Sequence, residues 1–492
     1  MNTQKVRNYM VSGALFMAAA VVSATDYTVS KSGNWSDASI WSDGEVPSTT
    51  VSDNVIFGAD NITLTVDGSG KTSVGTLNFG SYNATIDIAS GSTLHLDKKD
   101  SLGVAAGKKL TFNGDGMLEL RGAAWNVVST ASTLEFNTDV SIVTSQGHFS
   151  AAAVTFNKGF TAANNVIFHG NSYVDFHGNI NVAQQFNMYG SSTARASVFH
   201  ADSVVKVGTG SSGGIILRTA KVFGSIEVNK NRENNTSLLG YDGGTTVFEE
   251  GSSFVQQNSG TTDSFIGNVV ERGKLQIKAG VKNFDLEKDL RIRGTLQLGA
   301  SNLITIGGKA QGEASFDICA VDRAEAHKHL ISSKTSKIIL DADNDFGKFN
   351  FYGDSVLTIV ANGFASTIGG FGTVDTESYS YTTTSGSTVN VVGATGSVTL
   401  KITESEDFKI FIKGGKKADG TADIANIESY LDNTDVRTSN IFVDGQEAFL
   451  IYNEEKGGWY VNSSAAVPEP ATVATIFGLF ALGFVAYRKR RC

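Results

Sequence analysis

The chain has 492 residues and a net charge of −9 at pH 7, with 54 glycines, 30 phenylalanines and only 3 prolines. Glycine and phenylalanine beside long stretches of Ser, Thr, Asn, Val and Ile are typical of many short strands joined by tight turns, so the composition argues against a helix-rich fold. The acidic balance argues against a nucleic-acid partner, because neutralising phosphates needs a basic surface.

Residues 1–24 have the pattern of a secretory signal peptide. Lys5 and Arg7 give a positive start, an apolar stretch covers residues 11–22, and small residues precede a cleavage site after Ala24. The exported region then holds Cys319 as its single cysteine, since the other is the last residue of the chain. An extended hydrophobic core, rather than a disulfide framework, must therefore hold the exported fold together.

Residues 25–53 are predicted to cap the N-terminal end of a repetitive β-fold. Trp35 and Trp41 are six residues apart and are followed by a turn at Asp43-Gly44 and by Pro47. We interpret the two indoles as the core of the cap, because the unpaired strand edges at the end of such a fold need to be covered. The alternative is that Trp35 and Trp41 form a glycan contact by stacking against a sugar.

This opening resembles the start of bacterial secreted proteins that carry autotransporter-associated β-strand repeats. The residues that carry the resemblance are Gly33, Trp35, Trp41, Pro47, Asp53 and Val55. The strands farther along are similar in character but follow no strict repeat consensus. The resemblance implies a β-helical body like that of an autotransporter passenger.

Residues 54–400 contain many short segments of four to six residues with alternating apolar positions, which is the pattern of a β-strand. Gly, Asn, Asp or Ser separates one such segment from the next. The clearest copies are LTFNGDG, LEFNTDV and VTFNKGF, whose Phe112, Phe136 and Phe156 are spaced by 24 and 20 residues. That interval is near one coil of a parallel β-helix, or β-solenoid. We therefore predict an all-β solenoid in which inward residues, and the recurring Phe and Asn, stack from coil to coil. The alternative is a set of β-sandwiches.

The best acidic cluster is DADNDFG, which places Asp341, Asp343 and Asp345 at alternate positions. It begins like a calcium-binding loop, but Phe346 stands where that loop needs Gly and Tyr352 where it needs the bidentate Glu. A standard site is therefore excluded, and the cluster is interpreted as a solvated turn, with a weak surface Ca²⁺ site as the alternative.

Parallel β-helices also host polysaccharide lyases and hydrolases, whose sites need carboxylates with an Arg or Lys on adjacent coils. No catalytic motif occurs in the sequence, and we predict no catalytic residue, metal or cofactor. His169 and His177 each follow a Phe in the same phrase, so they are expected to stack on one face. Both are interpreted as surface histidines.

Residues 401–461 no longer follow the repeated strand pattern and are predicted to form a β-rich C-terminal cap. The stretch SNIFVDGQEAFLIYNEEKGGWYV is typical of a hairpin or meander, with turns at Asp444-Gly445 and Gly457-Gly458. Residues 462–466 are a polar linker.

Residues 467–492 begin with Pro-Glu-Pro and continue with a 17-residue apolar run from Ala471 to Tyr487. As a helix this run would span about 26 Å, close to the hydrocarbon core of a membrane, and it is apolar on all sides. Arg488 to Arg491 would hold its far end in the cytoplasm. We therefore predict a single transmembrane helix.

The order of these elements closely resembles the PEP-CTERM sorting signal. The sorting motif is matched by Val467, Pro468, Glu469, Pro470 and Ala471, and the basic stop by Arg488, Lys489, Arg490 and Arg491. The resemblance implies a Gram-negative type of bacterium, an exosortase of the inner membrane as partner, cleavage near the motif, and delivery to the cell surface or the extracellular matrix.

Together these patterns predict an exported, non-enzymatic structural or adhesive protein that is in the inner membrane only transiently. Exopolysaccharide or surface glycans are its candidate ligands. The alternatives are a carbohydrate-active β-helical enzyme and a glycan-binding module.

Overall fold

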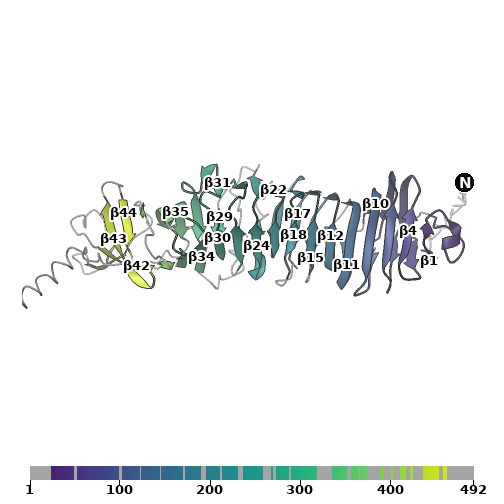
Figure 1. The fold of residues 1–492 in the computed structure, drawn as a ribbon, viewed down its shortest axis with the longest axis horizontal. Helices are drawn as coiled ribbons and strands as arrows, with labels where there is room; N and C mark the ends of the chain where they lie inside the picture. The colour runs from purple at the N-terminus through teal and green to yellow at the C-terminus, as the bar shows by residue number, and fades with distance from the viewer. Residues whose placement is uncertain are drawn as a thin grey trace, which may run out of the picture.

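The computed structural model describes residues 24–48, 53–98, 102–121, 124–143, 146–169, 172–189, 195–210, 213–230, 237–258, 268–269, 273–287, 290–318, 335–351, 356–364, 366–373, 388–392, 401–402, 411–416, 422–424, 436–453 and 458–462. These residues form a long rod of stacked β-coils, as Figure 1 shows. Their regular structure is almost entirely strand, with two short 3-10 helices, η1 (Ala38–Ile40) and η2 (Tyr241–Gly243). The predicted parallel β-helix is confirmed.

Three ladders of parallel strands run along the rod, and we call them faces 1, 2 and 3. Face 1 consists of β2 (Gly33–Asn34), β4 (Ile62–Val66), β7 (Ala84–Ile88), parts of β10 (Lys109–Leu120), β11 (Ala124–Ile142) and β12 (Gln146–Phe156), then β15 (Tyr173–Phe176), β18 (Ser197–Phe199), β21 (Ala220–Val222), β24 (Thr245–Phe248), β27 (Lys274–Ile277), β30 (Thr295–Leu298), β34 (Thr335–Leu340), β36 (Val356–Val360), β38 (Thr388–Val392) and β42 (Val436–Val443).

Face 2 is built in the same way from β5 (Gly70–Val74), β8 (Ser92–Leu96), the second parts of β10 and β11, β13 (Phe160–Ala162), β16 (Asn179–Val182), β19 (Val204–Val207), β22 (Ser225–Lys230), β25 (Ser253–Asn258), β28 (Asn283–Leu286) and β31 (Thr305–Ile306). Its ladder ends at β31, which pairs in antiparallel fashion with β32 (Lys309–Ala310).

Face 3 begins with the four-stranded sheet of β1 (Asp26–Val29), β3 (Asn54–Phe57), β6 (Thr76–Asn78) and β9 (Leu102–Gly103). It continues through the first parts of β11 and β12, then β14 (Val166–Phe168), β17 (Gln185–Met188), β20 (Gly214–Leu217), β23 (Leu238–Leu239), β26 (Asn268–Val269), β29 (Leu290–Ile292), β33 (Ser315–Ile318), β35 (Asn344–Phe351) and β37 (Ser366–Thr373).

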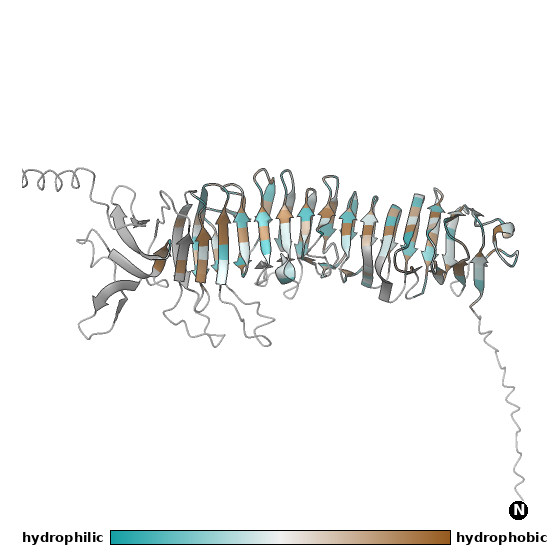
Figure 2. Cartoon of the chain, turned by 60° about the horizontal axis from the view of Figure 1, so that its bottom comes forward, coloured by the Kyte–Doolittle hydropathy of each residue, from teal (hydrophilic) through white to brown (hydrophobic). Residues whose placement is uncertain are grey.

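Alternating side chains of each strand point into the rod, which gives the banding of hydrophilic and hydrophobic residues in Figure 2. On face 1 the phenylalanines of the repeated phrase pair directly, Phe112 with Phe136 and Phe136 with Phe156, so the predicted stacking is confirmed. The Phe136 and Phe156 ring centroids are 4.9 Å apart, and those of Phe156 and Phe176 are 5.4 Å apart with planes 4° from parallel.

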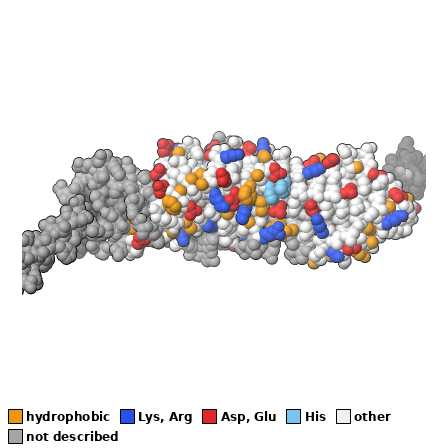
Figure 3. Space-filling model, in the orientation of Figure 1, with side chains coloured by type: hydrophobic (Ala, Val, Ile, Leu, Met, Phe, Trp, Pro, Cys, Tyr) orange, Lys and Arg blue, Asp and Glu red, His pale blue; other side chains and the backbone are white. Residues whose placement is uncertain are grey.

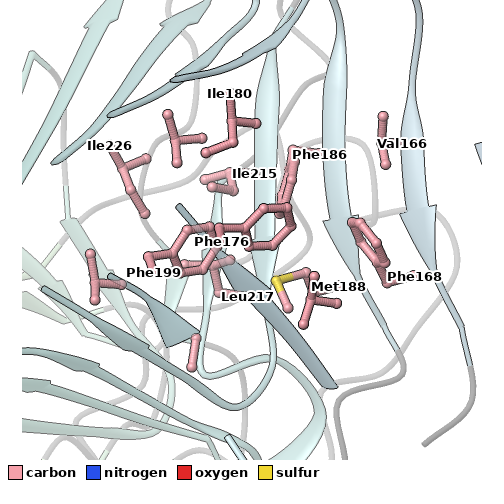
Figure 4. Close-up of a cluster of buried hydrophobic side chains, with 14 of the residues drawn as sticks. Val166, Phe168, Phe176, Ile180, Phe186, Met188, Phe199, Ile215, Leu217 and Ile226 are labelled. Atoms are coloured by element: carbon pink, nitrogen blue, oxygen red, sulfur yellow. The ribbon is translucent and has the colours of Figure 1, made fainter. Parts of the chain in front are cut away.

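Residues of face 3 fill the remaining interior beside this stack. Figure 4 shows Phe168, Phe186 and Met188 beside Phe176 and Phe199 of face 1. All five side chains are buried. The core is therefore continuous along the rod, and each coil contributes to it only through contacts with its neighbours.

The corners need residues that can turn sharply. β10 passes from face 1 to face 2 at Gly114, which has a φ of 106° and whose missing Cβ would lie 2.0 Å from the Ile88 oxygen. Only glycine fits this position, because a side chain would meet the backbone of the preceding coil.

The C-terminal region forms an antiparallel meander of β42, β43 (Gln446–Asn453) and β44 (Gly458–Asn462), as the sequence predicts. Asp444 and Gly445 both have positive φ, 47° and 79°, at the two-residue turn between β42 and β43. The short strands β39 (Lys401–Ile402), β40 (Phe411–Lys416) and β41 (Ala422–Ile424) complete this region.

Replacing Phe156 with Ala should lower the free energy of unfolding by about 3–5 kcal/mol, because it leaves a cavity between two stacked rings. Hydrogen exchange of backbone amides should speed up most in the coils on either side, since repeat folds open locally. The control is Thr155→Ala, which changes a side chain on the outward side of the same strand. This substitution should change the free energy of unfolding by less than about 0.5 kcal/mol. An equal effect of the two substitutions would contradict the core assignment.

Candidate functional site

The tryptophans of the N-terminal cap are buried. Trp35 is 4% and Trp41 3% exposed, and their rings pack edge to face with centroids 5.2 Å apart. The Trp41 Nε1–H donates to the Trp35 carbonyl oxygen at 3.1 Å, and Trp41 also forms a β-bridge with Val29. Stacking on a sugar needs an accessible ring face, so this burial favours the interpretation as cap core over the glycan contact.

A line of polar side chains follows face 1 at the corner where it passes to face 2. Asn113, Asn137 and Asn157 occupy successive coils, and each amide donates to the one before it: Asn137 Nδ2 lies 2.8 Å from Asn113 Oδ1, and Asn157 Nδ2 lies 2.5 Å from Asn137 Oδ1. The predicted stacking of recurring asparagines is confirmed. We call these three residues the amide ladder.

Two histidines continue the line of the amide ladder. His177 and His200 stack with ring centroids 3.8 Å apart and planes 12° from parallel. The His177 Nδ1 also lies 3.0 Å from Asp202 Oδ1. Figure 3 shows histidine side chains gathered at the middle of the visible face, among charges of both signs.

The expected stacking of His169 on His177 is wrong. His169 follows β14 on face 3, whereas His177 follows β15 on face 1. The ring that His169 contacts is His148 of β12, at a centroid distance of 5.1 Å and with planes 9° from parallel. The same phrase therefore occurs on two faces, and each histidine pairs with a residue from the neighbouring coil.

Burial lowers the pKa of His148, His169 and His200 below the ordinary histidine value. The adjacent imidazole adds to this effect at His169 and His200. At His200 the carboxylates of Asp175 and Asp202 act in the opposite direction but do not overcome it. These three imidazoles are therefore mostly neutral at pH 7.

A charged cluster on face 2 was not anticipated from the sequence. His95 of β8 is 1% exposed and lies between two carboxylates, with Nδ1 2.8 Å from Glu119 Oε1 and Nε2 3.3 Å from Asp97 Oδ1. Lys71 Nζ lies 2.7 Å from Glu119 Oε1, and Arg121 Nη1 lies 3.6 Å from Asp97 Oδ1. We call these five residues, which span three coils, the charge cluster. The 24-residue interval from His95 to Glu119, the same as from Phe112 to Phe136, is the signal that could have found it.

The chemistry of the charge cluster is that of an ion-pair network. Burial would raise the pKa of Glu119, but Lys71 and His95 outweigh it and hold that pKa below the ordinary value. A general acid at neutral pH needs the opposite shift. Glu119 pairs with Lys71, Asp97 pairs with Arg121, and the His95 imidazole lies between the two carboxylates, so the arrangement joins neighbouring coils.

The acidic residues Asp341, Asp343 and Asp345 lie between β34 and β35 and at the start of β35. Asp341 accepts a hydrogen bond from Gln297, and Asp345 lies in β35. Within the described ranges no three His, Cys, Asp or Glu side chains come together in a way that could hold a metal ion. The weak Ca²⁺ site at Asp341, Asp343 and Asp345 gains no support from this geometry.

The predicted signal peptide, apart from Ala24, lies outside the described residues. The same is true of the predicted sorting signal at residues 467–492, with its motif, its apolar transmembrane run and its basic stop. In the part of the chain that the structure covers, no helix is long and apolar enough to cross a membrane.

Comparison with known proteins identifies one element. Residues 466–491 match the family model described as the PEP-CTERM protein-sorting motif. No curated protein and no solved structure matches the chain. The motif implies that the protein is exported as an exosortase substrate and reaches the cell surface or the extracellular space, and the structure shows that its body is a β-solenoid.

The lowered pKa values of His148, His169 and His200 predict a loss of stability on mild acidification. Because their folded-state pKa lies below the unfolded-state value, they contribute stability that is present above about pH 6.5 and is lost as pH falls through the folded-state pKa. We expect the thermal midpoint to fall between about pH 7.5 and about pH 5.5. Carboxylates with lowered pKa, such as Glu135 beside Lys109, titrate below this window.

The control for this effect is the triple variant His148→Gln, His169→Gln and His200→Gln, measured by thermal unfolding over the same pH range. Its midpoint should change less with pH than that of the wild-type protein. If the two pH profiles coincide, the assignment of the acid-sensitive groups is wrong.

Asn137, the central residue of the amide ladder, is expected to contribute more to the free energy of unfolding than Asn157 does. Asn137→Ala removes both inter-coil amide bonds and should lower the free energy of unfolding by about 1–3 kcal/mol, whereas Asn157→Ala removes one and should cost about 0.5–1.5 kcal/mol. Urea denaturation of the two variants provides the comparison. An Asn157→Ala variant that is the less stable of the two would contradict a cooperative ladder.

Proposed function

We propose that the protein is a non-enzymatic structural or adhesive component of the cell surface or extracellular matrix. The observation that carries the proposal is the combination of a C-terminal sorting motif at residues 466–491 with a long repetitive β-rod. A sorting signal of this kind specifies a destination outside the inner membrane. A long rod is a shape suited to spacing or to contact along its length.

The proposed route has three stages. Residues 1–24 direct export and are removed as a signal peptide. The apolar run from Ala471 to Tyr487 then crosses the inner membrane transiently, with Arg488 to Arg491 held in the cytoplasm. Exosortase finally cleaves near Val467 to Ala471 and frees the solenoid for the outer surface or the matrix.

The surface of the rod supports a structural role. Several of its described charges form ion pairs that join coils, such as Lys71 with Glu119 and Lys158 with Asp115. The amide ladder adds uncharged hydrogen bonds along one edge. Such a surface is well hydrated and compatible with polysaccharide, which is the partner class we propose beside exosortase.

The enzyme alternative rests on one feature, the carboxylates Asp97 and Glu119 beside Lys71 and Arg121 on stacked coils. Lyases and hydrolases on this fold class use such groups. Here the side chains neutralise one another, and the His95 imidazole between them is buried. We therefore favour the non-enzymatic role.

A relationship to proteins with autotransporter-associated β-strand repeats is proposed from the first turns of the rod. The buried pair Trp35 and Trp41 and the buried Asp53, which accepts from the Ser48 hydroxyl at 2.6 Å, give the residues of that opening a packing role. On this proposal the body is passenger-like, and the tryptophans close its N-terminal end.

The sorting step is tested by the full-length variant Pro468→Ala, Glu469→Ala, Pro470→Ala in the native host. We expect wild-type protein in the surface or extracellular fraction without its last residues, and the variant in the inner membrane with Cys492 intact. Membrane fractionation followed by mass spectrometry of the C-terminal peptide measures both properties.

The matched control is Ser463→Ala with Ser464→Ala, which changes the neighbouring linker and should leave sorting intact. Wild-type protein that stays in the inner membrane with an uncleaved C-terminus would show that the tail is a permanent anchor and that the proposed route is wrong.

A further inference from the structure

The carboxylate of Asp53 is buried at the corner that leads into β3. Asp53 is 2% exposed, and its side chain accepts a hydrogen bond from the Ser48 hydroxyl at 2.6 Å. The ion pairs found between described residues do not include it. Buried carboxylates are normally paired, because taking the charge out of water costs free energy. The burial of Asp53 therefore points to a positive partner.

Asp53 lies directly beside Thr25 of the preceding coil. Asp26 pairs with Asn54 in the parallel ladder of β1 and β3, which places the residues before them side by side. The Asn54 N–H donates to the Thr25 carbonyl oxygen at 2.9 Å. In a parallel pair the N–H and C=O of one residue point toward the same neighbouring strand, so the Thr25 nitrogen also faces the coil of Asp53.

The other charged groups at this corner are held on the outer side of face 3. The Asp26 carboxylate accepts from the Asn54 Nδ2 at 2.7 Å, and the Lys98 Nζ donates to the Asn54 Oδ1 at 3.0 Å. Asn54 is an outward residue of β3, since the next residue, Val55, points into the core. The nearest lysine is thus directed to the amide of Asn54 and not to the carboxylate of Asp53.

We propose that Asp53 is the binding site for the α-ammonium group that removal of the signal peptide creates at Thr25. The inference rests on the export route proposed above, in which cleavage follows Ala24. A signal peptidase adds water across the Ala24–Thr25 peptide bond, which leaves a carboxylate on the signal peptide and an amine on Thr25. That amine takes up a proton at pH 7, because the ordinary pKa of an α-amino group is about 7.7–8.0.

The new charge changes how the first strand is held. Before cleavage the Thr25 nitrogen is a neutral amide, whereas afterwards an ammonium group faces the buried carboxylate of the next coil. β1 also carries part of the cap, because Val29 forms a bridge with Trp41. Thr25 is exposed, so water still reaches one side of the ammonium group. The N-terminal end of the rod is therefore closed more firmly in the processed protein than in its precursor.

The test is a titration of the Thr25 α-amine in protein recovered from the surface or extracellular fraction of the native host. Mass spectrometry of the N-terminal peptide first identifies the terminus. Reductive methylation with ¹³C-labelled formaldehyde then allows NMR to follow the α-amine. We expect its pKa to be raised to about 9 by the adjacent carboxylate, and Asp53→Asn should return it to about 8.

The matched control is Asp26→Asn, which removes the carboxylate nearest to Thr25 in the sequence and should leave the α-amine pKa raised. A second measurement avoids dependence on variant folding. In the wild-type protein at about pH 7, acetylation of the α-amine should be about tenfold slower in the folded state than in urea, because one pKa unit corresponds to tenfold less free amine.

The outcomes separate the pairing from the export route. A mature terminus other than Thr25 would overturn both the inference and the proposed end of the signal peptide. An ordinary pKa at a Thr25 terminus, equal acetylation rates in the two states, or a raised pKa that disappears in Asp26→Asn but not in Asp53→Asn would overturn the pairing alone and leave the export route standing.

Discussion

The structure depends on one constraint, the in-register hydrogen bonding of each coil to the next. A slip of one residue would turn every inward side chain outward, so the buried Phe112, Phe136 and Phe156 fix the register for the whole coil. Once that register is set, identical positions on the outside must also stack. The amide ladder and the charge cluster are consequences of the same alignment, because a side chain finds its partner in the coil above or below.

This alignment explains how an exported chain with one cysteine in its body can be held together. Each coil is closed by backbone bonds to its neighbours and by a continuous apolar interior, while outward polar groups pair along the axis. Lys158 illustrates the second effect, because its Nζ reaches Asp115 at 2.7 Å and the Gly114 oxygen at 3.0 Å, more than forty residues earlier in the sequence. Long-range order is thus built from short-range contacts.

The features that the sequence predicts correctly are those set by the repeat within one face or by a local turn motif. The interval between phenylalanines gave the coil length, the phrase gave the asparagine stacking, and Asp444-Gly445 gave the hairpin turn. What it does not predict is which face a given copy occupies, because corner lengths vary from coil to coil. Phe168-His169 and Phe176-His177 look alike but belong to faces 3 and 1, so the histidine partners were assigned wrongly. The sorting motif is local and needs no fold to be recognised.

Nearest-neighbour stacking also has a consequence for how such a protein changes over evolutionary time. A duplication or loss of one whole coil, such as the 20-residue interval from Phe156 to Phe176, preserves the register on both sides and leaves both ends untouched. Rod length is therefore a property that tandem duplication can adjust in steps of one strand spacing, about 4.8 Å. The N-terminal turns with Trp35 and Trp41 and the C-terminal sorting motif are independent of that length, so the length of the rod can change without altering either end.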